Sequence, residues 1–408
     1  TDRLNTAEIP HVDWPEPAPN PLFVARVHEL ARLNGHLDDA LNGNGRIVFV
    51  TGGAGRGKTS LLAEFARRAQ EAHQDLLTVG GSGSAIAGVG DAYLPFREVM
   101  EQLTGNIAAR RTSGAMGVEQ TRRLWALLPQ TTQTILDHGP QLLELFVSGK
   151  QLLTRAAAAA PAGASWLAAL REEVTRRHRA RDPREHTAVF GQFTSVLHHL
   201  AQQRPLLITL DDLQWMDAAS RGLLFHLGRR LAGSRILIVG AYRPDDLLPG
   251  QDDQAHPLGQ LLDEFKRQFG NVFIDLAAAD EAEGMAFVEA FLDSEPNQLD
   301  AAFRQALFKR TEGHPLFVVE LLRDMQSRGD LVQDKAGRWR EGEVLHWQTF
   351  PARVEAVIAQ RVDRLDDDLR TILEVASVAG ELFTAEVVAQ VLAMAERPLL
   401  RSLSQELG

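Results

Sequence analysis

The chain has 408 residues, 44% of them apolar and 24% charged, which is ordinary for a globular protein of two or three domains. Its formal net charge of -11 argues against a general polyanion-binding surface, so nucleic acid is not an expected partner. No apolar run approaches the roughly 18 residues that span a bilayer and the N-terminus lacks a signal pattern, so we expect a cytoplasmic protein without a membrane partner. The absence of cysteine excludes disulfides and thiolate metal sites.

The first 278 residues have the pattern of a linker followed by an α/β domain. Residues 1–21 hold several prolines and little apolar periodicity, which predicts an extended linker. Leucines at helical spacing then predict a helix that ends at Asn42-Gly43-Asn44-Gly45. Since helical stretches separate most of the strand-like runs that follow, we expect a parallel sheet with helices on both faces in residues 22–278. The runs that predict its buried strands are residues 47–50, 76–79, 206–210, 236–239 and 272–276.

A long insertion separates the second predicted strand from the third. Residues from about 95 to 204 are mostly helical by their apolar period. They predict helices laid on the sheet, with one flexible stretch near residues 179–184. The arginines of residues 171–184 are more typical of a solvated helix face than of a contact with nucleic acid.

The last third of the chain is predicted to be mainly helical. Residues 279–330 carry three helical stretches and predict a lid subdomain. Residues 331–340 predict a hairpin that turns at Asp334-Lys335-Ala336-Gly337. Further helices are expected at residues 352–365, 367–376 and 384–394. We therefore predict a winged-helix domain in residues 331–408, truncated so that its wing is missing.

A phosphate-binding signature lies between the first predicted strand and the amphipathic run after it. It reads Gly52-x-x-x-x-Gly57-Lys58-Thr59, the pattern of a P-loop. Glycines let the loop backbone approach phosphate oxygens, and the following helix points its positive dipole end at the same anion. Lys58 is expected to reach the β- and γ-phosphates and the Thr59 hydroxyl to ligate Mg²⁺. We therefore predict that ATP or ADP binds through Gly52, Gly53, Ala54, Gly55, Arg56, Gly57, Lys58, Thr59 and Ser60.

Two acids and an arginine follow the third and fourth predicted strands. Asp211 and Asp212 end an aliphatic run, and ligands of such sheets bind at the carboxyl ends of the strands. We expect Asp211 to hold Mg²⁺ and Asp212 to orient the attacking water as a base. Arg243 is expected to contact the γ-phosphate with its planar guanidinium. The predicted catalytic groups are thus Asp212, Lys58 and Arg243.

These motifs together resemble those of the STAND-class signalling ATPases of the AAA_16 and NB-ARC-like groups. Such ATPases are found in regulatory proteins that have tetratricopeptide-type sensors. The matching pieces are Phe23-Val24-Ala25-Arg26, Gly52 to Thr59, Asp211-Asp212-Leu213-Gln214-Trp215, Gly240-Ala241-Tyr242-Arg243 and Gly313-His314-Pro315-Leu316-Phe317.

The resemblance implies roles for further residues. It places Val24 and Arg26 beside the adenine, makes Arg243 the first sensor, and sets Pro315 against the base from the helical lid. The chain departs from the usual family pattern twice in the first of these segments: Ala25 stands where glycine is common, and Val27 stands where glutamate is common.

The resemblance also implies a function, namely an ATP/ADP-dependent switch. ADP would hold the sheet, lid and winged helix closed, and ATP would open them and promote self-association, with slow hydrolysis between the two states. The sensor and effector domains of the family are not in this chain. Two alternatives remain: an AAA+ initiator-type ATPase that remodels DNA through its winged helix, and a nucleotide-binding scaffold without turnover. Residues 352–365 carry both positive and negative charges, which favours a winged helix that holds the ADP-bound state closed over one that binds DNA.

Overall fold

The computed structural model describes most of the chain. The described residues are 23–84, 92–106, 118–160, 164–179, 186–248, 256–270, 272–276 and 281–347, with shorter pieces between 351 and 394. The predicted linker, residues 1–21, and nearly all of the predicted flexible stretch near residue 180 lie outside them. The chain divides into two compact units, Thr1–Ser294 and Glu295–Gly408, and each is described by itself.

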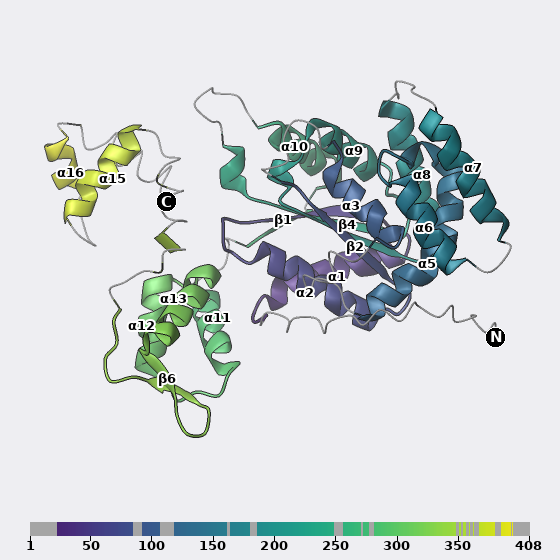
Figure 1. Ribbon diagram of the computed structural model, residues 1–408. Coiled ribbons are helices and arrows are strands. Elements are labelled where there is room, and N and C mark those ends of the chain that lie inside the picture. The colour runs from purple at the N-terminus through teal and green to yellow at the C-terminus, as the bar shows by residue number, and fades with distance from the viewer. Residues whose placement is uncertain are drawn as a thin grey trace. The chain divides into compact units, whose positions relative to one another are not determined.

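The first unit is built on a five-stranded parallel sheet in the order β2-β3-β4-β1-β5 (Figure 1). All five predicted strands are confirmed, and four of them extend beyond the predicted ends, two of these by three residues. Strand β4 lies between β1 and β3, so the ends that carry the phosphate loop, the acids and Arg243 are neighbours. The strands are β1 (Arg46–Thr51), β2 (Leu77–Ser82), β3 (Leu206–Asp211), β4 (Ile236–Tyr242) and β5 (Phe273–Asp275).

Successive side chains along each strand point to opposite faces of the sheet and pack into two separate cores. In β1, Ile47 and Phe49 belong to one buried cluster, whereas Val48 and Val50 belong to the other. In the part of the chain that the structure describes, both faces of the sheet are therefore covered, and ligands of such sheets bind at the carboxyl ends of the strands. The helices of the two faces are α1 (Val27–Leu41) and α2 (Lys58–Ala72) on one, and α3 (Leu94–Leu103), α9 (Ala218–Gly228) and α10 (Pro257–Phe269) on the other (Figure 1).

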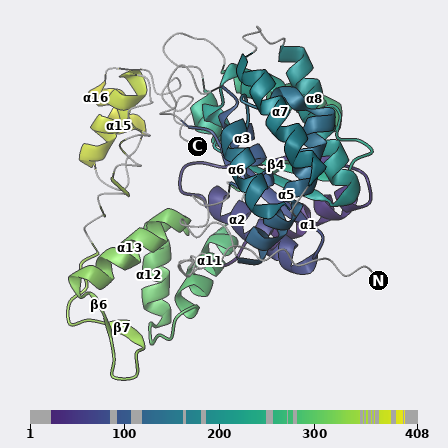
Figure 2. The same cartoon turned by 45° about the vertical axis from the view of Figure 1, so that its right-hand side comes forward.

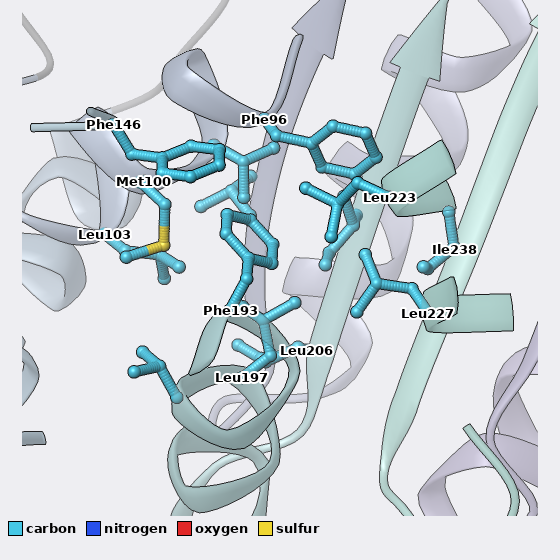
Figure 3. Close-up of a cluster of buried hydrophobic side chains, with 14 of the residues drawn as sticks. Phe96, Met100, Leu103, Phe146, Phe193, Leu197, Leu206, Leu223, Leu227 and Ile238 are labelled. Carbon is cyan, nitrogen blue, oxygen red and sulfur yellow. The ribbon is translucent and has the colours of Figure 1, made fainter. Parts of the chain in front are cut away.

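The predicted helical insertion forms a bundle that shares the core of the sheet. Phe193 lies at the centre of that core, with ring centroids 5.5 Å from Phe96 and 4.9 Å from Phe146 (Figure 3). Leu206 and Ile238 of the sheet lie in the same cluster. Figure 2 shows the bundle from its outer side, with its helices in front of the sheet. Its elements are α5 (Val118–His138), η1 (Pro140–Leu142), α6 (Gly149–Ala159), α7 (Ser165–Arg179) and α8 (His186–Gln203).

The insertion also covers the exposed edge of the sheet, a role that the sequence did not reveal. Strand β2 is an edge strand, and its outer backbone groups need hydrogen-bond partners. Gln102 of α3 is buried, accepts from the Gly80 N–H at 3.1 Å and donates to the Gly80 carbonyl. Gln120 of α5 donates to the Thr78 carbonyl, and Glu98 accepts from the Ser82 N–H at 2.9 Å.

Replacing Gln102 by methionine is expected to destabilise the first unit by about 2 to 4 kcal/mol, because two buried backbone groups of Gly80 lose their partners. Urea unfolding followed by tryptophan fluorescence measures this loss. Gln203→Met, at an exposed position, is the control and is expected to stay within about 0.5 kcal/mol of the wild type. Equal midpoints for the two variants would contradict the edge-covering role.

The second unit contains the predicted hairpin and helices. The turn of the hairpin is closed by Asp334, which accepts from the Ala336 N–H at 2.8 Å and the Arg338 N–H at 3.0 Å, and Gly337 has a φ of 74°. Most of the helix predicted at residues 352–365 lies outside the described residues. The elements are α12 (Ala301–Thr311), α13 (Pro315–Arg328), β6 (Leu331–Gln333), β7 (Trp339–Glu341), α15 (Asp367–Ala379) and α16 (Ala385–Val391).

Helix α11 (Glu281–Asp293) is the first of the three helical stretches predicted in residues 279–330, and it ends just before the division between the units. The lid role of these residues stays a prediction. Two short 3₁₀ turns, η2 (Leu213–Trp215) and η3 (Pro244–Leu247), follow β3 and β4. No helix in the described part of the chain has the length and apolar character needed to cross a membrane.

Candidate nucleotide-binding site

The predicted phosphate loop connects β1 to α2. Gly55 and Gly57 have φ angles of 73° and 85°, the left-handed conformation that glycine adopts without strain. Helix α2 begins at Lys58, directly after the loop. By helix geometry its first N–H groups have no partner within the helix, and the positive end of its dipole faces the loop. This arrangement fits a phosphate group.

The ammonium group of Lys58 is held inside this loop. Its Nζ donates to the carbonyl oxygens of Gly52 at 2.6 Å and Gly53 at 2.8 Å, and only 6% of the residue is exposed. Burial, together with the nearby charge of Arg243, lowers the pKa of Lys58 to about 8. A phosphate in the loop would give this buried ammonium an anionic partner, so the residue fits the predicted role.

Thr59 and Asp211 meet at the end of β3. The Thr59 hydroxyl donates to Oδ2 of Asp211 at 2.5 Å, and Oδ1 of Asp211 accepts from the Asp212 N–H at 2.9 Å. Burial raises the pKa of Asp211, and the hydrogen bond from Thr59 opposes that rise. A hydroxyl and a carboxylate are oxygen ligands of the kind that Mg²⁺ binds together with phosphate oxygens. The pair therefore fits a magnesium site.

Asp212 and Arg243 lie beside this pair, and a third residue connects them. Asp212 has a φ of 50°, in the left-handed region of the backbone. Nη2 of Arg243 lies 3.7 Å from Oδ1 of Asp212. The buried amide of Gln214 donates to the same Oδ1 at 2.8 Å and accepts from the Arg243 N–H at 3.2 Å. The sequence interpretation quoted Gln214 within a motif but gave it no role.

The segment predicted to lie by the adenine reaches the phosphate loop through Arg26. Its guanidinium pairs with Glu29 at 2.7 Å and donates at 3.4 Å to the carbonyls of Arg56 and Leu276. Ala25 has a φ of 62°, in the left-handed region that glycine adopts with less strain than alanine. Val24 is half-buried, and its predicted contact with the base is a proposal.

Pro315 belongs to the second unit. It is the first residue of α13, directly after His314, whose ring stacks on Phe317 with centroids 4.2 Å apart. Proline is favoured at this position because the first N–H of a helix has no intrahelical partner. Its predicted contact with the nucleotide base is likewise a proposal.

The lowered pKa of Lys58 predicts that nucleotide affinity falls above pH 8. Below that pH the group is already charged in the free protein, whereas above it binding must take up a proton. We expect a loss of up to about tenfold in affinity per pH unit between pH 8 and 10. Calorimetric titration with ATP at pH 9, in two buffers of different ionisation enthalpy, measures the uptake. Identical heats of binding in both buffers would contradict the proton uptake.

Comparison with known proteins agrees with this geometry. The AAA_16 family model, described as an AAA ATPase domain, matches residues 22–239, which is more than half of the 408 residues. No curated protein matches the chain. A chain from a solved structure of Drosophila ORC bound to GC-rich DNA and Cdc6 has 12% identity and a TM-score of 0.26, and the match covers 83% of this chain and 100% of that chain. So weak a likeness carries no argument about function. The chain belongs to the AAA_16 family of AAA ATPase domains.

Proposed function

We propose that the chain is an ATP/ADP-dependent molecular switch of the STAND class, which binds Mg²⁺ and nucleotide, hydrolyses ATP slowly and self-associates in the ATP state. The observation that carries the proposal is that one end of the sheet brings together the loop lysine, the Thr59–Asp211 pair and Arg243. This set supplies a phosphate cradle, a metal site and a cation able to detect the γ-phosphate.

Each residue has a defined task in this proposal. Lys58 and the first N–H groups of α2 bind the phosphates. Thr59 and Asp211 hold Mg²⁺, which when bound offsets charge on the phosphate oxygens. Asp212 orients water and accepts its proton, because a carboxylate at the strand end lies near the phosphates. Arg243 distinguishes ATP from ADP by contacting the γ-phosphate.

A switch requires that ATP and ADP bind its two conformations with different affinities. Arg243→Ala is therefore expected to lower ATP affinity by about 1.5 to 3 kcal/mol, roughly 10- to 150-fold, while ADP affinity changes less than about threefold. Titration calorimetry with each nucleotide in the presence of Mg²⁺ measures both. Arg229→Ala, at an exposed position on the Phe225 ring, is the control. An equal loss for both nucleotides would count against the sensor role.

The alternative is a DNA-remodelling ATPase. The same phosphate site serves either function, and the expectation that nucleic acid is not a partner is untested. Tight, salt-sensitive binding of duplex DNA that stimulates hydrolysis would favour this alternative over the switch.

A further inference from the structure

Gln214 occupies a position that links the two groups assigned to water activation and to γ-phosphate detection. Only 3% of the residue is exposed. Its Nε2 donates to Oδ1 of Asp212 at 2.8 Å, and its Oε1 accepts from the backbone N–H of Arg243 at 3.2 Å. One side-chain amide therefore bridges the segment after β3 and the segment after β4.

The chemistry of its partners fixes the orientation of this amide. The N–H of Arg243 is only a donor, and the carboxylate of Asp212, when ionised, is only an acceptor. An amide turned by 180° would place its NH₂ against an N–H and its oxygen against a carboxylate. Leaving such buried groups unsatisfied costs about 1 to 3 kcal/mol each, so the bridge has one stable arrangement.

We propose that Gln214 is a positioning residue that couples the carboxylate of Asp212 to the segment that carries Arg243. The proposal rests on the function proposed above. When the backbone after β4 shifts as Arg243 reaches a γ-phosphate, the N–H that Gln214 contacts shifts with it, and the amide transmits that shift to Asp212. The same Oδ1 lies 3.7 Å from Nη2 of Arg243. The carboxylate of Asp212 is therefore contacted both by the amide of Gln214 and by the guanidinium of Arg243.

The substitution Gln214→Glu tests the two hydrogen bonds of the bridge separately. When the introduced carboxyl group is ionised, it retains the acceptor for the Arg243 N–H but repels Asp212. When it is protonated, it donates an O–H to Asp212 and restores the bridge. Burial and the charge of Asp212 favour the protonated form, whereas the cations Arg243 and Lys58 oppose it. The ring of His256, which contacts the backbone of Gln214, adds little charge because burial lowers its pKa.

The test measures the ATP hydrolysis rate and ATP affinity of the full chain between pH 6 and pH 8. Gln214→Met is expected to lower kcat by about 10- to 100-fold while the dissociation constant changes less than about threefold, because binding groups are untouched and only the base is misplaced. Gln102→Met is the matched control, since it removes an equally buried amide at the sheet edge. It is expected to retain wild-type kcat.

Gln214→Glu is expected to show the same loss of kcat at pH 8. At pH 6 its kcat, expressed relative to that of the wild type, is expected to recover by at least about tenfold. A general packing defect would not recover with acid. Wild-type kcat in Gln214→Met, or a constant ratio of Gln214→Glu to wild type across the pH range, would overturn the inference.

The outcome separates this inference from the function on which it rests. A wild-type chain that binds no ATP overturns both. If the wild type binds ATP without turnover, Asp212 activates no water and has nothing for Gln214 to position, so the inference is overturned while the binding function stands.

Discussion

Lys58→Ala is expected to weaken ATP binding by about 3 kcal/mol or more, roughly 150-fold, because charge-assisted hydrogen bonds to phosphate contribute about 1.5 to 3 kcal/mol each. The wild-type ammonium is already held at the loop by the carbonyls of Gly52 and Gly53, so it need not be ordered when a nucleotide arrives. ADP binding is expected to weaken as well, since the β-phosphate loses the same partner.

Titration calorimetry on the purified chain measures the change. Lys150→Ala, at an exposed position on α6, removes the same charge away from the site and is expected to bind ATP like the wild type. Thermal unfolding of both variants distinguishes loss of binding from loss of folding. Wild-type affinity in a folded Lys58→Ala variant would show that phosphate binds elsewhere.

Asp212→Asn is expected to lower the rate of ATP hydrolysis by about 10²- to 10⁴-fold with little change in ATP affinity. Asparagine keeps the size of the side chain and an oxygen that accepts from Gln214, but it does not take a proton from water at neutral pH. A loss in kcat without a loss in binding is the signature of a base that acts during hydrolysis.

Asp245→Asn is the matched control for this variant. The charge of Asp245 also acts on Lys58, so the substitution removes an equal charge from the surroundings of the loop without touching the proposed base. It is expected to retain the wild-type rate within about threefold. Equal, near-zero rates in the wild type and Asp212→Asn would leave only the scaffold without turnover.

The fold of the first unit was predictable because its signals are local. Each buried strand is a short aliphatic run, and the loop motif between residues 47–50 and the following helix has a fixed spacing. The strand ends were underestimated at Gly80 and Gly240, because glycine breaks a propensity pattern. At the neighbouring Gly81 the packing requires glycine, since a Cβ there would clash with the backbone oxygen of Pro95.

The parts that escaped prediction depend on contacts between distant segments. Gln102 and Gln214 are polar residues whose importance comes from backbone groups 22 and 29 positions away, and no periodicity records such pairs. The left-handed backbone of Arg26 was equally hidden, since arginine does not signal it, whereas the glycine that is common at the position of Ala25 was a sign that went unused. Amides near a motif are therefore candidates for bridges when two strand ends are expected to be neighbours.

The central claim is that the identity of the nucleotide sets the state of the chain. Sedimentation velocity of the Asp212→Asn chain, which is expected to bind ATP without hydrolysing it, tests this claim most directly when run with Mg²⁺ and either ATP or ADP. The account predicts a faster-sedimenting, self-associated species with ATP and a smaller one with ADP. Superimposable profiles at saturating concentrations of both nucleotides would contradict it.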